Sequence, residues 1–257
     1  MATPAFAALL WLGAFPSARI VILGLITVFA GYTAIYALND LVDYRIDREK
    51  AQMAGGLRES ENYLDAAMIR HPMAQGLLSF KEGLLWAVGW SVVALLGAWL
   101  LNPVCLLIFL AGCLLEAVYC GMHRISPFRT VISGGVKTAG AIAAIFAVDP
   151  DPSAAFVLSL FFWLFCWEIG GQNIPNDWAD VEEDRRLQAQ TVPVRFGPQK
   201  AAWLAVAALV SSLAAKLSMI YQSGLDIKSS FALVSLAIGG WLMMPAAWRL
   251  LPVSYTH

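Results

Sequence analysis

The chain has 257 residues, of which 59% are hydrophobic and only 14% are charged, and its mean hydropathy is +0.66. Soluble domains carry about 25% charged residues, so this composition excludes a soluble globular enzyme and a disordered chain. The formal net charge of −1 excludes the basic footprint of a nucleic-acid-binding protein. The sequence therefore predicts a protein whose surface lies in a lipid bilayer.

Apolar runs long enough to cross a membrane recur along the chain. A spanning helix needs about 20 mainly apolar residues, so the N-terminal stretch 4–15 is too short and predicts a partial helix. Seven later runs qualify, and they cover residues 20–38, 84–101, 103–119, 131–148, 154–175, 201–220 and 231–248. We therefore predict an all-α polytopic membrane helix bundle that forms one domain over residues 1–257.

The cysteines carry no predicted chemistry. All four lie in apolar runs, and no two of them form a C-x-x-C pair. Buried free cysteines usually behave as small hydrophobic residues. Neither a disulfide framework nor a zinc site is predicted.

The distribution of basic residues predicts the orientation. With seven spans, one side of the membrane carries the loops 40–82, 121–130 and 177–200 together with the C-terminus, and most of the 17 Lys and Arg residues lie there. Basic loops stay on the cytoplasmic side. The long polar loops are thus expected in the cytoplasm, as in an enzyme that draws a polar substrate from that side.

A nine-residue acidic pattern occurs twice, each time where an apolar run ends. Residues 39–47 and residues 176–184 both read N-D-x-x-D-x-x-x-D. In a helix, residues three and four apart share a face, so each segment predicts a stripe of three carboxylates beside an asparagine. Like charges in a stripe repel one another, and divalent cations relieve that repulsion. Carboxylate oxygens suit Mg²⁺, which substrate phosphates usually help to coordinate. Two facing stripes predict a site for a Mg²⁺-bridged diphosphate.

These motifs resemble those of the UbiA superfamily of intramembrane aromatic prenyltransferases. The first motif fits the family pattern fully, and Asp180 and Asp184 match the family's second motif, D-x-x-x-D. The segment 191–197 (TVPVRFG) is similar to the family's T-x-P-V-x-F-G, and 70–79 (RHPMAQGLLS) to its R-P-L-x-x-G-x-I-S loop. Residues 119–124 fall where the family often has Y-x-x-x-K-R, with His123 in place of the lysine. Members usually have more helices, so the protein is expected to lack parts of the first and last family helices.

The resemblance implies Mg²⁺-dependent transfer of a prenyl group from a prenyl diphosphate to a lipophilic or aromatic, quinone-precursor-like acceptor. It implies metal ligands, direct or through water, at Asn39, Asp40, Asp43, Asp47, Asn176, Asp177, Asp180 and Asp184. Asp43 and Asp180 are the expected catalytic members of this set. Candidates for binding the diphosphate are Arg45, Tyr119, Arg124, Lys137 and Arg195.

Two acidic residues, Glu116 and Glu168, fall at membrane depth, where ionisable groups are costly and are candidates for function. Glu168, Gln172 and Asn176 recur every four residues and predict a polar stripe leading to the second motif. We hypothesise that Glu168 is catalytic and orients the acceptor or accepts its proton. Aromatic side chains expected to shield a cationic centre are Tyr32, Tyr36, Trp86, Trp90, Phe162, Trp163 and Trp167.

Other functions stay open at this stage. The same fold with a phosphoglycerol or porphyrin-type acceptor, or a prenyl diphosphate cyclase, fits the same motifs. A cation transporter is a distant third, because transport sites usually lie near the midplane and most of the acidic residues here lie at helix ends. The D-G-x-x-A-R element of CDP-alcohol phosphotransferases is absent.

Overall fold

The computed structural model describes residues 2–45, 47–48, 72–223, 234 and 238. Its helices are α1 (Ala2–Leu12), α2 (Ala18–Val42), α4 (Phe80–Leu101), α5 (Pro103–Gly121), α6 (Arg129–Val148), α7 (Ala154–Trp167), the π-helical segment η2 (Glu168–Asn173), α8 (Ile174–Ala179), α9 (Val181–Arg186), α10 (Val192–Phe196) and α11 (Pro198–Gln222). The described residues contain no strand, which confirms the predicted all-α fold.

Six helices are long and apolar enough to cross a membrane, counting α7, η2 and α8 as one continuous span. They confirm six of the seven predicted spans, and α1 confirms the predicted partial helix. The seventh predicted span, 231–248, lies outside the described residues except for Val234 and Ile238. The protein is a multi-pass integral membrane protein.

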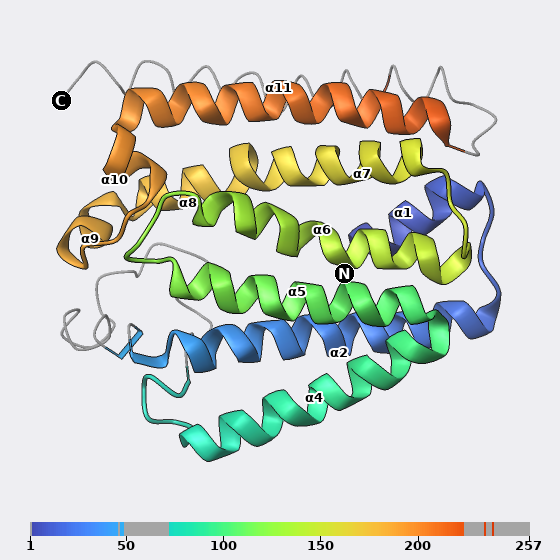
Figure 1. Ribbon diagram of the computed structural model, residues 1–257, viewed down its shortest axis with the longest axis horizontal. Helices are drawn as coiled ribbons and strands as arrows, with labels where there is room; N and C mark the ends of the chain where they lie inside the picture. The colour runs from blue at the N-terminus through green and yellow to red at the C-terminus, as the bar shows by residue number, and fades with distance from the viewer. Residues whose placement is uncertain (1, 46, 49–71, 224–233, 235–237, 239–257) are drawn as a thin grey trace.

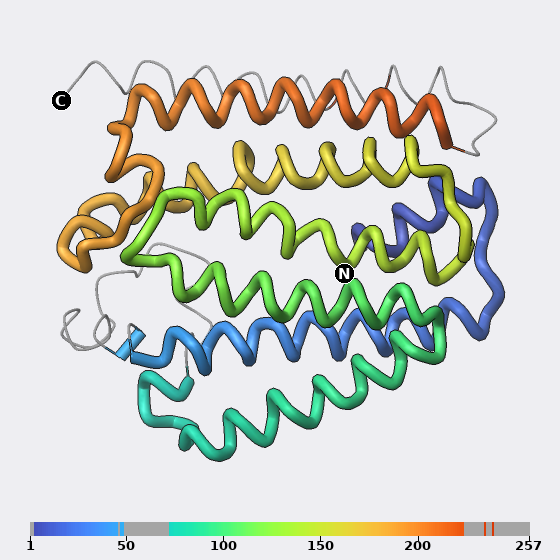
Figure 2. The backbone as a smooth tube through the Cα atoms, in the orientation of Figure 1, coloured from blue at the N-terminus to red at the C-terminus, as the bar shows by residue number. Residues whose placement is uncertain are grey.

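The spanning helices lie side by side, in the order α4, α2, α5, α6, α7 and α11 across the view of Figure 1. Neighbours in this row are in contact with one another. The short helices α8, α9 and α10 gather at one end of the bundle, which is also the end where α2 finishes (Figure 2). The fold therefore brings both acidic motifs to the same end.

Local sequence sets the turns at the opposite end. Asn102 caps α5 by accepting a hydrogen bond from the backbone N–H of Val104 (2.8 Å), and Pro103 occupies the first turn of α5, where its missing N–H costs nothing. The amide nitrogen of Asn102 also donates to the carbonyl oxygen of Phe146 (2.9 Å) on α6. One side chain thus ties the α4–α5 turn to a third helix.

Small residues allow the helices to approach closely. A Cβ atom at Gly170 would lie 2.5 Å from the carbonyl oxygen of Ala205, so η2 packs against the backbone of α11. Such contacts drive helix association in membranes, where lipid is as apolar as leucine. Large apolar side chains such as Leu85 and Leu107 instead point outward, 73% and 64% exposed, and face the lipid.

The partial helix α1 packs against α6 at the end away from the motifs (Figure 1). The indole Nε1 of Trp11 donates to Oδ2 of Asp149 (2.9 Å), just beyond the end of α6. Ala7 and Leu10 are buried in a core cluster with Phe156 of α7. A helix too short to cross the membrane is thus held by its packing against α6 and α7.

Candidate active site

The two acidic motifs follow the same backbone course. Helix α2 ends just before Asp43, whose N–H donates to the carbonyl oxygen of Asn39 (2.8 Å). Helix α8 ends just before Asp180, whose N–H donates to the carbonyl oxygen of Asn176 (3.2 Å). The structure corrects one detail, because the predicted stripe does not continue along one uninterrupted helix. The short polar side chain of aspartate favours helix ends, and each helix stops at the middle aspartate.

After each interruption the backbone resumes a helical turn and buries the last aspartate. The N–H groups of Asp47 and Asp184 donate to the carbonyl oxygens of Asp43 and Asp180, each at 2.9 Å. Asp47 is 9% exposed and Asp184 is 4% exposed. The hydroxyl of Thr191 donates to Oδ2 of Asp184 (3.0 Å), so the TVPVRFG segment supports the second motif. The remaining motif residues are more accessible: Asp40 and Asp177 are half-buried, and Asn176 and Asp180 are exposed.

Arg129 is a buried cation that interacts with both motifs. It is the first residue of α6 and is only 8% exposed. Its guanidinium lies 4.3 Å from the centre of the Tyr119 ring, donates to the hydroxyl of that tyrosine and contacts the ring of His123. It also interacts electrostatically with Asp43 of the first motif and Asp177 of the second. One buried cation therefore faces both acidic segments.

Arg129 is not among the predicted diphosphate-binding residues. The motif resemblance favours Arg124, which the structure places on an exposed turn between α5 and α6. Arg45 and Arg195 are exposed as well. The signal that was missed is the position of Arg129 directly before an apolar run, where a charged side chain is kept only if it has partners.

The side chain of Asn39 is held by α5. Its amide nitrogen donates to Oε1 of Glu116 (2.9 Å) and to the sulfur of Cys120 (3.3 Å). Glu116 is 7% exposed. Because both contacts use the nitrogen, the amide oxygen, the only atom of that amide that binds a hard cation, is turned away from α5.

A second polar group lies deeper in the bundle. The Nζ atom of Lys137 lies 3.4 Å from the hydroxyl of Tyr36 and 5.0 Å from the centre of its ring. Lys137 interacts electrostatically with Glu168 and Glu116. The hydroxyl of Ser133 donates to Oε1 of Glu168 (3.1 Å), which is 8% exposed. The structure thus brings together the predicted residues Lys137 and Glu168.

The π-helical segment changes the predicted polar stripe below Glu168. Glu168 and Asn173 are buried, whereas Gln172 and Asn176 are exposed. A π-helix bonds residues five apart, so Asn173 takes the place that a four-residue repeat assigned to Gln172. The hydroxyl of Thr130 donates to Oδ1 of Asn173 (2.8 Å), which joins this segment to α6 beside Arg129.

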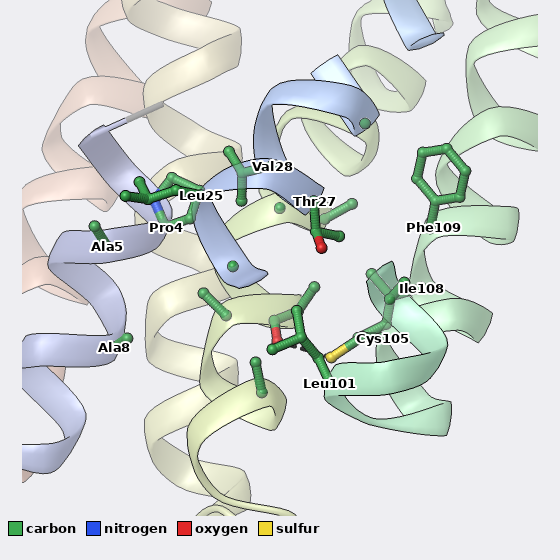
Figure 3. Close-up of a pocket in the computed structure, with 18 of the residues that line it drawn as sticks. Pro4, Ala5, Ala8, Leu25, Thr27, Val28, Leu101, Cys105, Ile108 and Phe109 are labelled. Atoms are coloured by element: carbon green, nitrogen blue, oxygen red, sulfur yellow. Dashed lines mark hydrogen bonds between the residues drawn. The ribbon is translucent and has the colours of Figure 1, made fainter. Parts of the chain in front are cut away.

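An apolar cavity of about 240 Å³ begins at this polar group. Tyr36 and Lys137 line one end, and Leu101, Phe15 and Val148 line the far end. Figure 3 shows the wall formed by α1, α2 and α5, with side chains such as Ala8, Val28 and Ile108. Of the seven aromatic residues predicted to shield a cation, only Tyr32 and Tyr36 belong to the lining. A partly exposed cationic end thus leads into a hydrocarbon-like interior.

A family model described as the UbiA prenyltransferase family matches residues 1–255. The chain belongs to this family. The match confirms the resemblance seen in the motifs and covers the helices that form the cavity as well as both acidic segments.

Curated UbiA relatives differ in the acceptors that their names indicate. The protein is 29% identical over 222 residues to digeranylgeranylglyceryl phosphate synthase from Methanosarcina mazei, covering 84% of this chain and 68% of that protein. It is 23% identical to 4-hydroxybenzoate octaprenyltransferase from Saccharophagus degradans, covering 74% of this chain and 58% of that one. The sequence thus spans about three fifths to two thirds of the length of these relatives.

The fold is that of solved UbiA homologues. The structure of a UbiA homologue from Archaeoglobus fulgidus, described as bound to GPP and Mg²⁺, matches with a TM-score of 0.70 at 17% identity, covering 92% of this chain and 79% of that homologue. A similarity at this level of identity concerns the fold.

The UbiA-like loops meet at the motif end of the bundle. The N–H of Gln190 donates to the carbonyl oxygen of His123 (2.9 Å), which joins the TVPVRFG side to the α5–α6 turn. In the RHPMAQGLLS loop, residues 70 and 71 lie outside the described residues, and Met73 is buried.

Proposed function

We propose that this UbiA-family protein transfers a prenyl group from a prenyl diphosphate to an acceptor within the membrane, with Mg²⁺ as cofactor. The observation that carries the proposal is the position of Arg129, which faces both acidic segments from a buried site. Further along α6, an apolar cavity starts at Lys137. A ligand that consists of a diphosphate and a hydrocarbon tail needs both parts of such a site, because charged residues bind the diphosphate and an apolar channel holds the tail.

The residues present suit Mg²⁺. Among the described residues no three His, Cys, Asp or Glu side chains form a ready-made metal cage. Mg²⁺ does not need one, because it usually takes one or two protein carboxylates and completes its shell with waters and substrate phosphates. All the donors are oxygens, and the amide of Asn39 is turned to offer its oxygen. The proposed ligands remain Asn39, Asp40, Asp43, Asp47, Asn176, Asp177, Asp180 and Asp184.

Bound Mg²⁺ supplies Lewis acidity that neutralises charge on the departing diphosphate. Arg129 adds a preplaced positive charge at the same end, and in the low-dielectric interior such a charge needs no reorganisation during the reaction. The allylic C–O bond breaks, a bond from the acceptor to that carbon forms, and the diphosphate carries away the electron pair. Lys137 and the ring of Tyr36 border the cavity where the reacting carbon enters, and the apolar walls exclude water.

Glu168 is the proposed proton acceptor. Ser133 donates a hydrogen bond to its carboxylate, and Lys137, which lines the polar end of the cavity, interacts with it electrostatically. An aromatic acceptor that gains a carbon substituent must lose a ring proton, and Glu168 receives it in this scheme. A Glu168→Gln variant with unchanged turnover would remove this role.

We propose an aromatic, quinone-precursor-like acceptor of the kind named for the relative from S. degradans. The similarity to the synthase from M. mazei favours a second candidate, a phosphoglycerol acceptor.

We also propose that the motif end faces the cytoplasm, because most Lys and Arg residues lie in the loops predicted on the same side of the membrane as both motifs.

The test incubates membranes containing the protein with labelled prenyl diphosphates, with 4-hydroxybenzoate or geranylgeranylglyceryl phosphate, and with or without Mg²⁺. We expect Mg²⁺-dependent formation of a prenylated product with one of the two acceptors. If no donor is consumed in a Mg²⁺-dependent way, the proposal is wrong. If product forms only with the phosphoglycerol, the acceptor is the second candidate and not an aromatic compound.

A further inference from the structure

The length of the apolar cavity carries information on the prenyl donor that the motifs do not. Its lining follows α2 continuously from Tyr36 to Ile20. At 1.5 Å of rise per residue, these sixteen steps correspond to about 24 Å. On α6 the lining follows from Val136 to Val148 in the same direction. The cavity is therefore a channel that runs along the helices rather than a compact pocket.

An isoprene unit adds four carbon–carbon bonds of about 1.5 Å to the length of a prenyl tail, or about 5 Å when extended. Four units span about 20 Å and fit between the polar end at Tyr36 and the far end at Ile20. One or two units leave most of the channel unfilled. Eight units span about 40 Å, well beyond the length of the lining along α2. We propose that the donor tail has about four isoprene units, as in geranylgeranyl diphosphate, an inference that rests on the proposed function.

The channel does not enclose the prenyl tail completely. Val21 and Leu25 belong to its lining and are also 37% and 56% exposed, so one side is open toward the lipid. The enclosed volume of about 240 Å³ is therefore smaller than the space available to a bound tail. The length of the lined path along the helices, rather than the enclosed volume, is therefore the quantity that a bound tail matches.

Gly24 leaves the channel open near its far end. It lies twelve residues before Tyr36 on α2, about 18 Å along the axis, where the fourth isoprene unit would lie. It belongs to the lining, and a Cβ atom built at this position meets no atom within 4 Å. A larger side chain at Gly24 thus enters the channel without displacing protein atoms and blocks the last unit.

Gly89 provides a matched control. It is also a helical glycine, on α4, whose Cβ would meet nothing within 4 Å, but it does not line the channel. Gly24→Phe and Gly89→Phe therefore place the same side chain on a helix in open space, and only the first shortens the channel.

The experiment measures kcat/KM for geranyl, geranylgeranyl and octaprenyl diphosphates in wild type, Gly24→Phe and Gly89→Phe. We expect the wild type to prefer the four-unit donor at least tenfold over both others. The geranylgeranyl-to-geranyl ratio should fall at least tenfold in Gly24→Phe and stay within twofold of wild type in Gly89→Phe. Because misfolding lowers both rates together, the ratio is insensitive to it. Gly24→Leu should give a smaller shift and replaces the phenylalanine variant if that protein is not recovered.

A wild-type preference for the two-unit or eight-unit donor, or an unchanged ratio in Gly24→Phe and Gly24→Leu, would overturn the inference. Binding of unreactive thiolodiphosphate analogues of the same tail lengths separates this outcome from failure of the proposed function. If no donor is consumed but the four-unit analogue binds at least tenfold more tightly than the two-unit one, the proposed function fails and the assignment of tail length stands. Equal binding of the analogues overturns the assignment.

Discussion

The two acidic segments share a sequence pattern and a backbone course, but different parts of the molecule hold them. In the first, Asn39 is fixed by Glu116 of the neighbouring α5. In the second, Asp184 is fixed by Thr191 of the following loop. One segment is thus supported at its first residue by the helix bundle and the other at its last residue by a loop. The repeat contains the proposed ligands, whereas residues outside the repeat support them.

The largest expected effect comes from the middle aspartates, which should be equally necessary if the two segments act together. We expect Asp43→Asn and Asp180→Asn each to lower the rate of donor consumption by more than about hundredfold, because each removes a charge that holds the metal–diphosphate group in the proposed site. Asp151→Asn, in the exposed turn at the opposite end of the bundle, is the control. If Asp180→Asn retains half of the wild-type rate or more, the second segment is not a metal site.

Arg129 joins the two segments, and its loss should be the next largest effect. Arg129→Gln removes the cation facing Asp43 and Asp177 and should lower kcat by about hundredfold. Arg129→Lys should recover part of that loss, because it restores charge without the planar donor group. Arg124→Gln, on the exposed turn, should change kcat by less than about threefold. A larger effect at Arg124 than at Arg129 would restore the prediction made from the motif alone.

Glu116 distinguishes the first segment from the second. Glu116→Leu frees the amide of Asn39 to rotate, and we expect the affinity for a divalent cation to fall by about tenfold or more, as for other residues that orient a metal ligand. Glu116→Gln keeps an acceptor oxygen and should retain most of the affinity. Electron paramagnetic resonance of bound Mn²⁺, with an unreactive donor analogue present, measures this without turnover. Equal losses in both variants would indicate that Glu116 acts through its charge.

Thr191 gives the smallest effect and acts on stability. Thr191→Val removes one hydrogen bond from the buried carboxylate of Asp184, which should cost about 1–3 kcal/mol. In detergent, the midpoint of thermal unfolding should fall by several degrees. Ser211→Ala, which loses only an exposed bond to its own helix, should leave the midpoint unchanged. A midpoint for Thr191→Val equal to that of Ser211→Ala would mean that the loop does not support the second segment.

Local patterns predicted most of the fold. Apolar runs near 20 residues have few alternatives to spanning helices, and the repeated motif located the polar end of the bundle. Contacts between segments far apart in the sequence could not be predicted from these local patterns. Arg129 lies next to an apolar run, and its interaction with Asp43 after α2 and Asp177 of α8 follows only from how the helices pack. The partnership of Asn39 with Glu116, 77 residues away, depends on the same packing. Gly24 looks like any other glycine of an apolar helix until the channel beside it is seen.

The π-helical turn at residues 168–173 has a consequence for the phase of the helix it interrupts. A residue added to one turn rotates everything after it by about 100° relative to an uninterrupted α-helix. The residues of α7 that pack against neighbouring helices and the face of α8 that carries Asp177 therefore do not follow one continuous α-helical repeat. Deleting Gly171 would restore a single phase and turn Asp177 away from Arg129, although every side chain that bears the chemistry would still be present. Activity at this end of the molecule depends on a count of residues as well as on their identity.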